Sequence, residues 1–176
     1  MNIFWIEYNL ADCAKSMCDK HVVKMALEYA QMLSTAHHIH RSPWRAQAYK
    51  ITHSKHPCSV WVAHSPQNYA LLYRLWRYTC IEYNYRYDRM HRSWEEKCNV
   101  LKNLPTSDFS GKLTPPPLCM PEGHKQDDIV QSYRNYYVSK TLEFPVTQAW
   151  TLKSPMTWKK RSEPRWFAEA LKGRIE

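Results

Sequence analysis

The fold is decided by one stretch near the start of the chain, which reads LADCAKSMCDKHVVKMALEYAQMLSTAHH over residues 10–38. Apolar residues recur in it at steps of four and three, at Val22, Ala26, Tyr29, Leu33 and Ala36. This spacing puts all of these side chains on the same face of an α-helix. The stretch therefore predicts one long amphipathic helix from Leu10 to His38.

Two further long helices are predicted from their start signals. Ser65 and Pro66 combine a favoured N-cap residue with proline at the first helical position, and this helix is expected to run to about Tyr87. Ser93 and Glu96 have the spacing of a capping box, which predicts a third helix. Shorter helical segments are expected around 45–51, over 127–139 and after Ser162-Glu163-Pro164.

The segments between these helices complete the predicted fold. Residues 2–8 are aromatic and β-branched, which fits a short strand or an extended arm. Residues 105–125 form a long loop with three consecutive prolines, and Leu113, Leu118 and Met120 favour a strap anchored on the core. The sequence thus predicts an all-α fold. We expect a compact single-domain helical bundle of residues 1–176, with a short N-terminal extended segment and a long proline-rich surface loop.

The composition indicates a polyanionic partner. The chain has 176 residues, a formal net charge of +9, a pI of about 9.3, 8 Trp and 12 Tyr. A basic surface rich in flat rings is typical of proteins that hold phosphates and stack bases. A merely basic soluble protein is the alternative interpretation.

Several classes of protein are disfavoured by what the sequence lacks. It has only 3 glycines and no phosphate-binding or dinucleotide-binding fingerprint, which argues against kinases and dehydrogenases. No secretory signal precedes the 6 cysteines, and no apolar run approaches the roughly 20 residues of a membrane span. We therefore expect reduced thiols and a cytoplasmic location.

The first group of residues that can carry chemistry begins near the front of the long helix, with Asp19, Lys20 and His21. Lys24 and Glu28 follow His21 along a polar stripe beside the core stripe. An amine next to a carboxylate can attack a sugar carbon or an aldehyde to form a Schiff base, and a histidine can carry the proton. The alternative is an ordinary solvated face of charged residues.

The second group lies in the sequence His53-Ser54-Lys55-His56-Pro57-Cys58. Two histidines three residues apart and a cysteine resemble half of a zinc site, but the spacing is not that of a standard finger and no C-x-x-C occurs. We therefore predict no metal and no cofactor. His53 and His56 are assigned to hydrogen bonds with a phosphate or a base edge, or alternatively to capping the turn before Pro57.

The third group consists of cations that alternate with aromatic residues in the segments 78–92 and 158–166. Surfaces of this composition hold phosphates and stack bases. Cation–π packing within the protein is the alternative. The residues predicted to contact nucleic acid are His53, His56, Arg74, Arg77, Arg86, Arg89, Arg134, Lys159, Lys160, Arg161 and Arg165.

Three stretches of the chain carry a family resemblance. They are MNIFWIEYNLADCAKSMCDKHVVKMALEYAQMLSTAH (1–37), THSKHPCSVWVAHSPQNYALLYRL (52–75), and SYRNYYVSK (132–140) followed by RSEPRWF (161–167). Together they resemble the bacteriophage pyrimidine-dimer DNA glycosylase-like family over most of the chain. The motifs CDKHVVKM (18–25) and HPCSVW (56–61) are quite specific. A more distant resemblance leads to the characterised pyrimidine-dimer glycosylases.

This resemblance implies an all-helical, cytoplasmic DNA-repair enzyme that extrudes a base and cleaves its glycosidic bond with an amine and a carboxylate. The characterised enzymes use the amine of a small residue exposed by removal of methionine. In this chain Asn2 is too large for efficient removal of Met1, so that nucleophile is absent as such. Lys20 is the substitute, and Asp19 or Glu28 takes the acidic role; alternatively, the chain keeps the fold without the reaction.

The predicted function is that of a DNA-binding protein with N-glycosylase/AP-lyase activity on damaged or modified bases. Lys20 or Lys24 attacks C1′ of the sugar, Asp19 or Glu28 stabilises the transition state, and His21 moves the proton. DNA is favoured over RNA as the partner, and no membrane is expected. Three alternatives stay open: a non-catalytic nucleic-acid-binding phage protein, a nucleotide-processing enzyme and an inhibitor of a host protein.

Overall fold

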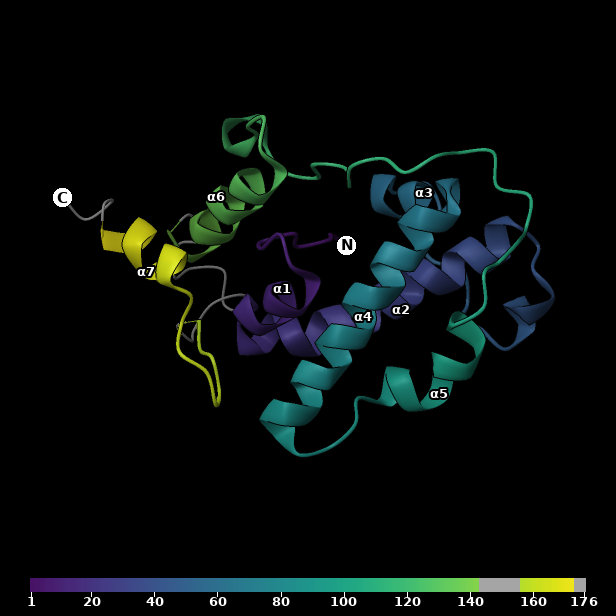
Figure 1. Ribbon diagram of the computed structural model, residues 1–176, viewed down its shortest axis with the longest axis horizontal. Coiled ribbons are helices and arrows are strands. Elements are labelled where there is room, and N and C mark those ends of the chain that lie inside the picture. Colours follow the sequence, from purple (N-terminus) through teal and green to yellow (C-terminus); the bar gives the residue numbers. More distant parts are fainter. Residues whose placement is uncertain (143–155, 173–176) are drawn as a thin grey trace.

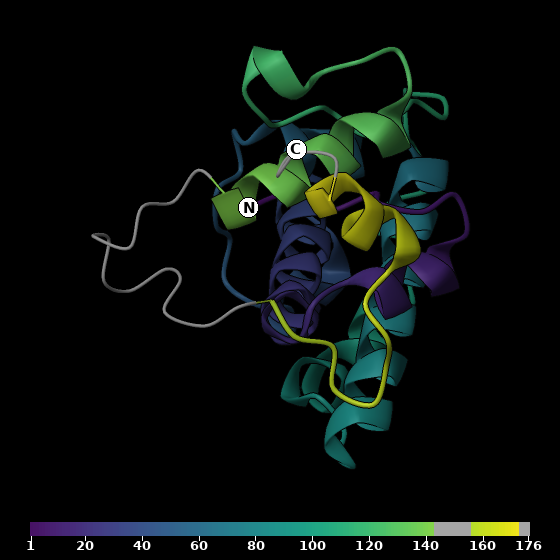
Figure 2. The ribbon, with the colours of Figure 1, turned by 90° about the vertical axis from the view of Figure 1, so that its left-hand side faces the viewer.

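The computed structural model describes residues 1–142 and 156–172 (Figures 1 and 2). These residues form helices and no strand, which confirms the predicted all-α fold. In chain order the elements are α1 (Leu10–Ser16), α2 (Asp19–Ile39), the 3₁₀ helix η1 (Pro43–Ala46), α3 (Pro57–His64), α4 (Pro66–Tyr87), α5 (Arg92–Leu101), the 3₁₀ helix η2 (Glu122–His124), α6 (Ile129–Leu142) and α7 (Arg165–Lys172). Within the two described ranges, no helix combines the length and the apolar character needed to cross a membrane.

Helices α2 and α4 cross at the centre of the fold, and α3 and α5 pack against α2 (Figure 1). The predicted core stripe of α2 is fully buried along its whole length, as expected. The indole N–H of Trp76 on α4 donates to the carbonyl of Ala26 at 2.9 Å, and the hydroxyl of Ser93 on α5 donates to the same oxygen at 2.8 Å. One carbonyl of α2 therefore links three helices inside the core, where an unpaired donor would be costly.

The helix predicted over residues 10–38 is divided in two, which corrects the sequence-based expectation. Helix α1 ends at Ser16 and α2 begins at Asp19. Between them, Cys18 has an extended backbone, with φ −66° and ψ 162°, and its N–H donates to the hydroxyl of Tyr137 on α6 at 2.8 Å. A tertiary hydrogen bond thus replaces a helical one, and no glycine or proline marks the break in the sequence.

The two other start signals have different outcomes. Ser65 caps α4 as predicted, because its hydroxyl accepts from the N–H of Asn68 at 3.1 Å. The capping box at α5 is wrong: His91 is the N-cap, and Ser93 points into the core instead. The segment 45–51 is helical only at its start, where η1 ends.

The predicted extended arm and strap are present, although one predicted anchor is wrong. The strap leaves α5, passes α3 and reaches α6 along the outside of the molecule (Figure 1). Leu118 and Met120 pack against the core, but Leu113 is 57% exposed. Thr114 holds the strap instead, because its carbonyl accepts from the Trp61 indole at 3.0 Å and its N–H donates to Asn68 at 3.1 Å.

Candidate functional site at the N-terminal arm

The side chain of Asn2 fixes the first residues of the arm. Its oxygen accepts from the N–H of Ile3 at 2.8 Å and from the hydroxyl of Tyr133 on α6 at 3.0 Å. Its amide donates to the carbonyl of Cys119 on the strap at 3.0 Å. Asn2 is 8% exposed, so these bonds lie in a largely dry environment and hold residue 1 in place.

The arm brings an amine to a carboxylate on α2. The amino group of Met1 lies 4.0 Å from Glu28 Oε2, and Nζ of Lys24 lies 3.2 Å from Glu28 Oε1. The Glu28 side chain is 14% exposed, whereas that of Lys24 is 63% exposed. A mostly buried carboxylate therefore has an amine on each of its oxygens.

Met1 has an accessible main chain. Its side chain is 3% exposed, yet the residue as a whole is half-buried, so the exposed part is largely the backbone that carries the amino group. An amine beside a carboxylate that can accept its proton is an arrangement suited to nucleophilic chemistry.

Lysines make the surroundings of this pair positive. Lys20, Lys24 and Lys140 all lie close enough to His21 to lower its pKa. Nζ of Lys140 also lies 4.4 Å from the centre of the Tyr136 ring. Lys20 is two helical turns from Glu28, about 12 Å along the axis, so it belongs to the rim of the site rather than to its centre.

His21 is held as a neutral packing group. Its ring stacks on Phe4 with 4.5 Å between the centroids, and its Nδ1 lies 2.8 Å from the hydroxyl of Tyr137. Burial, together with the nearby lysines, lowers the pKa of His21 to about 3. A ring that stays unprotonated at neutral pH is a poor match for the predicted role of proton carrier.

The state of His21 makes stability depend on pH. Its folded-state pKa lies below the ordinary 6.5, so the unfolded chain takes up a proton that the folded protein does not. Stability should therefore fall as pH drops from 6.5 toward 3, and His21→Gln should flatten that fall by up to about 1.4 kcal/mol per pH unit. Urea unfolding between pH 7 and 4 measures this, and parallel profiles for the two proteins would contradict it.

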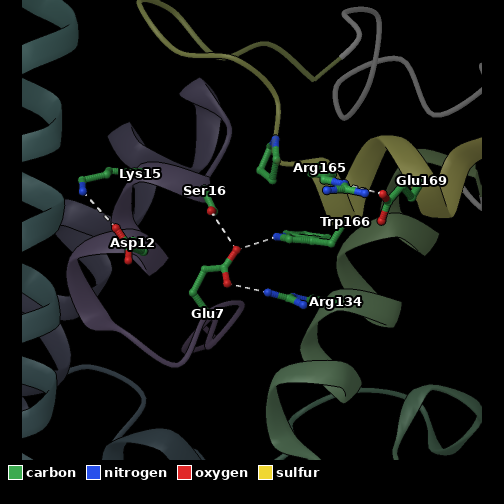
Figure 3. Close-up of a pocket in the computed structure, with 9 residues that line it drawn as sticks. Glu7, Asp12, Lys15, Ser16, Arg134, Arg165, Trp166 and Glu169 are labelled. Carbon is green, nitrogen blue, oxygen red and sulfur yellow. Dashed lines mark hydrogen bonds and ion pairs between the residues drawn. The ribbon is translucent and has the colours of Figure 1, made fainter.

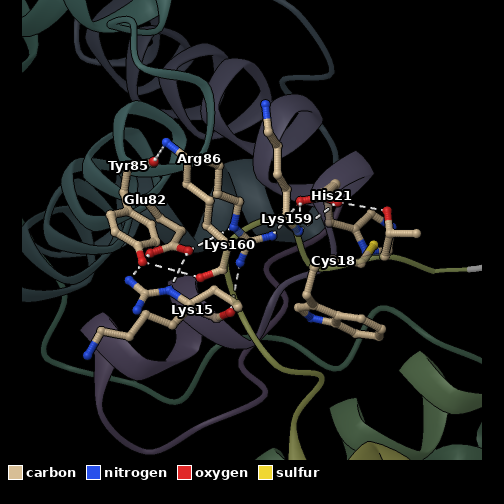
Figure 4. Close-up of polar contacts among 12 residues, drawn as sticks. Lys15, Cys18, His21, Glu82, Tyr85, Arg86, Lys159 and Lys160 are labelled. Atoms are coloured by element: carbon tan, nitrogen blue, oxygen red, sulfur yellow. Dashed lines mark hydrogen bonds and ion pairs between the residues drawn. The ribbon is translucent and has the colours of Figure 1, made fainter.

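Asp19 has a structural role. Its carboxylate accepts from Arg86 at 3.0 Å, from the hydroxyl of Thr157 at 2.7 Å and from the N–H of Lys159 at 2.9 Å. These bonds dock the segment after residue 155 onto the start of α2 (Figure 4). Of the two acidic residues predicted for the site, Glu28 is therefore the one beside amines.

Arg86 is buried, which corrects its assignment to the nucleic-acid surface. The side chain is 0% exposed, and its guanidinium donates to Glu82 at 2.7 Å, to Asp19 at 3.0 Å and to the carbonyl of Lys15 at 2.8 Å (Figure 4). The alternation of cations and rings suggested an outer face for this residue. Of the two carboxylates that hold it inside, Glu82 is one turn away on the same helix, whereas Asp19 lies 67 residues away.

The two basic and aromatic segments meet in space. Lys160 and Arg161 lie over the ring of Tyr85, at 5.8 Å and 4.1 Å from its centre, and Lys159 lies 5.2 Å from the centre of Tyr87. This is the geometry of the cation–π alternative. A base can stack on a ring face covered in this way only if the protein's own cation moves aside.

The other predicted contacts are spread over several surfaces. Arg74 and Arg77 are exposed on α4, and Arg89 lies 5.9 Å from the centre of the Tyr83 ring. His53 is exposed, with a backbone φ of 47°. Their predicted role in binding nucleic acid stays a proposal.

Arg134 lines an open pocket of about 520 Å³ between α1, α6 and α7 (Figure 3). Glu7 lies at its centre, accepts from Ser16 at 3.1 Å and from the Trp166 indole at 2.7 Å, and forms an ion pair with Arg134. Arg165 at the rim pairs with a glutamate of its own helix at 2.6 Å. The central groups bind one another, so we assign this pocket no ligand.

A cluster of sulfur and nitrogen atoms lies beside the arm. Donor atoms of His56, Cys58 and Cys119 lie within 4.8 Å of one another, and the two Sγ atoms are 3.6 Å apart. Burial lowers the pKa of His56 and raises that of Cys58. The positive amino group of Met1 is close enough to add to the first shift and to oppose the second. Sequence spacing identified His56 and Cys58, but Cys119 lies 61 residues away from Cys58 and carried no local signal.

Within an all-helical fold, the site is thus a carboxylate flanked by two amines. No family model, curated protein or solved structure matches this chain. The family resemblance described above therefore stays a prediction.

Proposed function

We propose that the protein is a DNA N-glycosylase with AP-lyase activity, in which an amine beside Glu28 attacks the sugar of a damaged nucleotide. The observation that carries this proposal is the placement of the Met1 amino group and of Lys24 Nζ on the two oxygens of one largely buried carboxylate, at 4.0 and 3.2 Å. The formal net charge of +9 and the lysines around the pair supply attraction for the DNA backbone.

Each group has a defined step in the proposed reaction. The neutral amine attacks C1′ while the glycosidic bond breaks, and the base leaves with the bonding electron pair and takes up a proton. Glu28 stabilises the positive charge that develops on the sugar and accepts the proton that the amine loses. Opening of the sugar ring gives the Schiff base, elimination of the 3′ phosphate breaks the strand, and water releases the amine.

The Met1 amino group is the favoured nucleophile. The bonds of Asn2 fix its position, whereas Lys24 extends into solvent. This assignment requires a mature chain that starts with a free Met1, which an intact-mass measurement tests directly. A chain without that amine would leave Lys24 as the nucleophile.

The proposal is tested by trapping the Schiff base. The full chain is incubated with an abasic duplex and with an ultraviolet-irradiated duplex in the presence of borohydride, and the adduct is mapped by peptide mass spectrometry. We expect an adduct on residue 1, or on Lys24 where residue 1 is blocked. The undamaged duplex controls for non-specific trapping, and Lys15→Gln, which alters an exposed lysine paired with Asp12, controls for loss of charge.

Two outcomes would reject this function. The first is the absence of any adduct although DNA is bound in low salt, which favours the non-catalytic nucleic-acid-binding alternative. The second is an adduct spread over exposed lysines with no preference for residue 1 or Lys24. Such an adduct would show non-specific reaction of surface amines rather than a reaction at the proposed site.

A further inference from the structure

We infer that His56, Cys58 and Cys119 form a zinc site that fastens the strap to the start of α3. The sequence predicted no metal, because the two residues at the start of α3 are only half of a ligand set. The strap supplies the missing thiol: Cys119 Sγ lies 3.6 Å from Cys58 Sγ, and a histidine donor lies within 4.8 Å of both.

The donor set favours zinc. Two thiolates and an imidazole are soft and borderline ligands, which suit Zn²⁺ rather than Mg²⁺ or Ca²⁺. With Zn–S bonds of about 2.3 Å in a tetrahedron, two sulfur ligands lie about 3.8 Å apart, close to the separation of the two Sγ atoms. Three protein ligands leave the fourth position for a water molecule.

The local structure prepares the three ligands. His56 is the N-cap of α3, and its Nδ1 accepts from the N–H of Cys58 at 3.2 Å, so the ring is fixed beside Cys58. An ion bound at Nδ1 would take over the lone pair that now accepts this hydrogen bond. Cys58 is 0% exposed in the first turn of the same helix. On binding, both thiols release their protons to solvent, and the two thiolates neutralise the charge of the ion.

A metal at this position would also order the arm. The carbonyl of Cys119 accepts from the side chain of Asn2 at 3.0 Å, and the hydroxyl of Ser59, next to Cys58, lies 3.9 Å from the sulfur of Met1. The ion would therefore join the strap, α3 and the arm at one point.

The test measures metal in the absence of DNA, so its result is independent of the proposed enzyme activity. The reduced full chain is incubated with Zn²⁺, freed of excess metal and analysed by elemental mass spectrometry. We expect about one zinc per chain, a higher Tm with zinc than without it, and a thiolate-to-metal charge-transfer band when Co²⁺ replaces Zn²⁺.

Variants locate the ion. Cys119→Ser and His56→Gln should each lose at least nine-tenths of the bound zinc, while Cys98→Ser, which alters a half-buried cysteine outside the cluster, should keep it. Both site residues are partly exposed, so their variants are expected to fold; circular dichroism checks this. Failure of the reduced native chain to retain zinc would overturn the inference, as would equal retention by Cys119→Ser.

Discussion

Replacing Arg86 with methionine is expected to lower the free energy of unfolding by about 3–5 kcal/mol, the range found when one partner of a buried ion pair is removed. The guanidinium is fully buried between Glu82, itself 3% exposed, and Asp19. Methionine fills a similar volume, but it removes the positive charge and the hydrogen bonds that offset the cost of burying these two carboxylates. Denaturant unfolding followed by circular dichroism measures the loss.

A matched variant separates burial from charge. Arg92→Met removes the same type of side chain from a pair of the same spacing, with Glu96, but the Arg92 side chain is 86% exposed. The loss there should be only a small fraction of the loss for Arg86→Met, because exposed helix pairs contribute little. Equal losses for the two variants would show that the buried network does not contribute as described. Arg86→Lys, which keeps the charge, should give an intermediate value.

Replacing Glu28 with glutamine is expected to slow formation of the trapped adduct on abasic DNA by about 10²-fold or more. Glutamine keeps the size and hydrogen-bonding capacity of the side chain but removes the negative charge that stabilises the sugar cation. The free energy of unfolding should change little. Glu28 and Lys24 form an ion pair across one turn of the same helix, and the lysine side chain is largely exposed, so the pair contributes little to stability. Single-turnover rates in borohydride measure the effect.

The control for Glu28 is another carboxylate that pairs with a lysine. Asp12→Asn disrupts the exposed pair with Lys15, so it changes the net charge by the same amount without altering the pair between Glu28 and Lys24. Its adduct rate should stay within about threefold of the native rate, because only weak long-range attraction is altered. An unchanged rate for Glu28→Gln would remove Glu28 from the reaction.

Local signals in the sequence predicted the parts of the fold that depend on neighbours along the chain. The stripe of α2 is periodic, so it could be recognised without tertiary information. The N-cap at Ser65 likewise acts within one turn. The break before Asp19 was missed because the group that stabilises it, the hydroxyl of Tyr137, lies 119 residues from Cys18.

The candidate site was predicted only in part, for the same physical reason. Lys24 and Glu28 are one turn apart, so a helix alone brings them together. The position of the Met1 amino group depends on Tyr133 and Cys119, and both of these residues are far from residue 1 in the sequence. Arg86 was misplaced because its partner Asp19 lies 67 residues away, so an arginine among tyrosines gave no sign of burial.

The bond between Asn2 and Tyr133 has a consequence for synthesis of the chain. Residue 2 is made 131 residues before its partner. Until α6 has emerged and docked, the arm lacks this bond, and the Met1 amino group is held less firmly beside Glu28. A nascent chain therefore has the carboxylate on α2 before it has the assembled site, which forms only once α6 is in place.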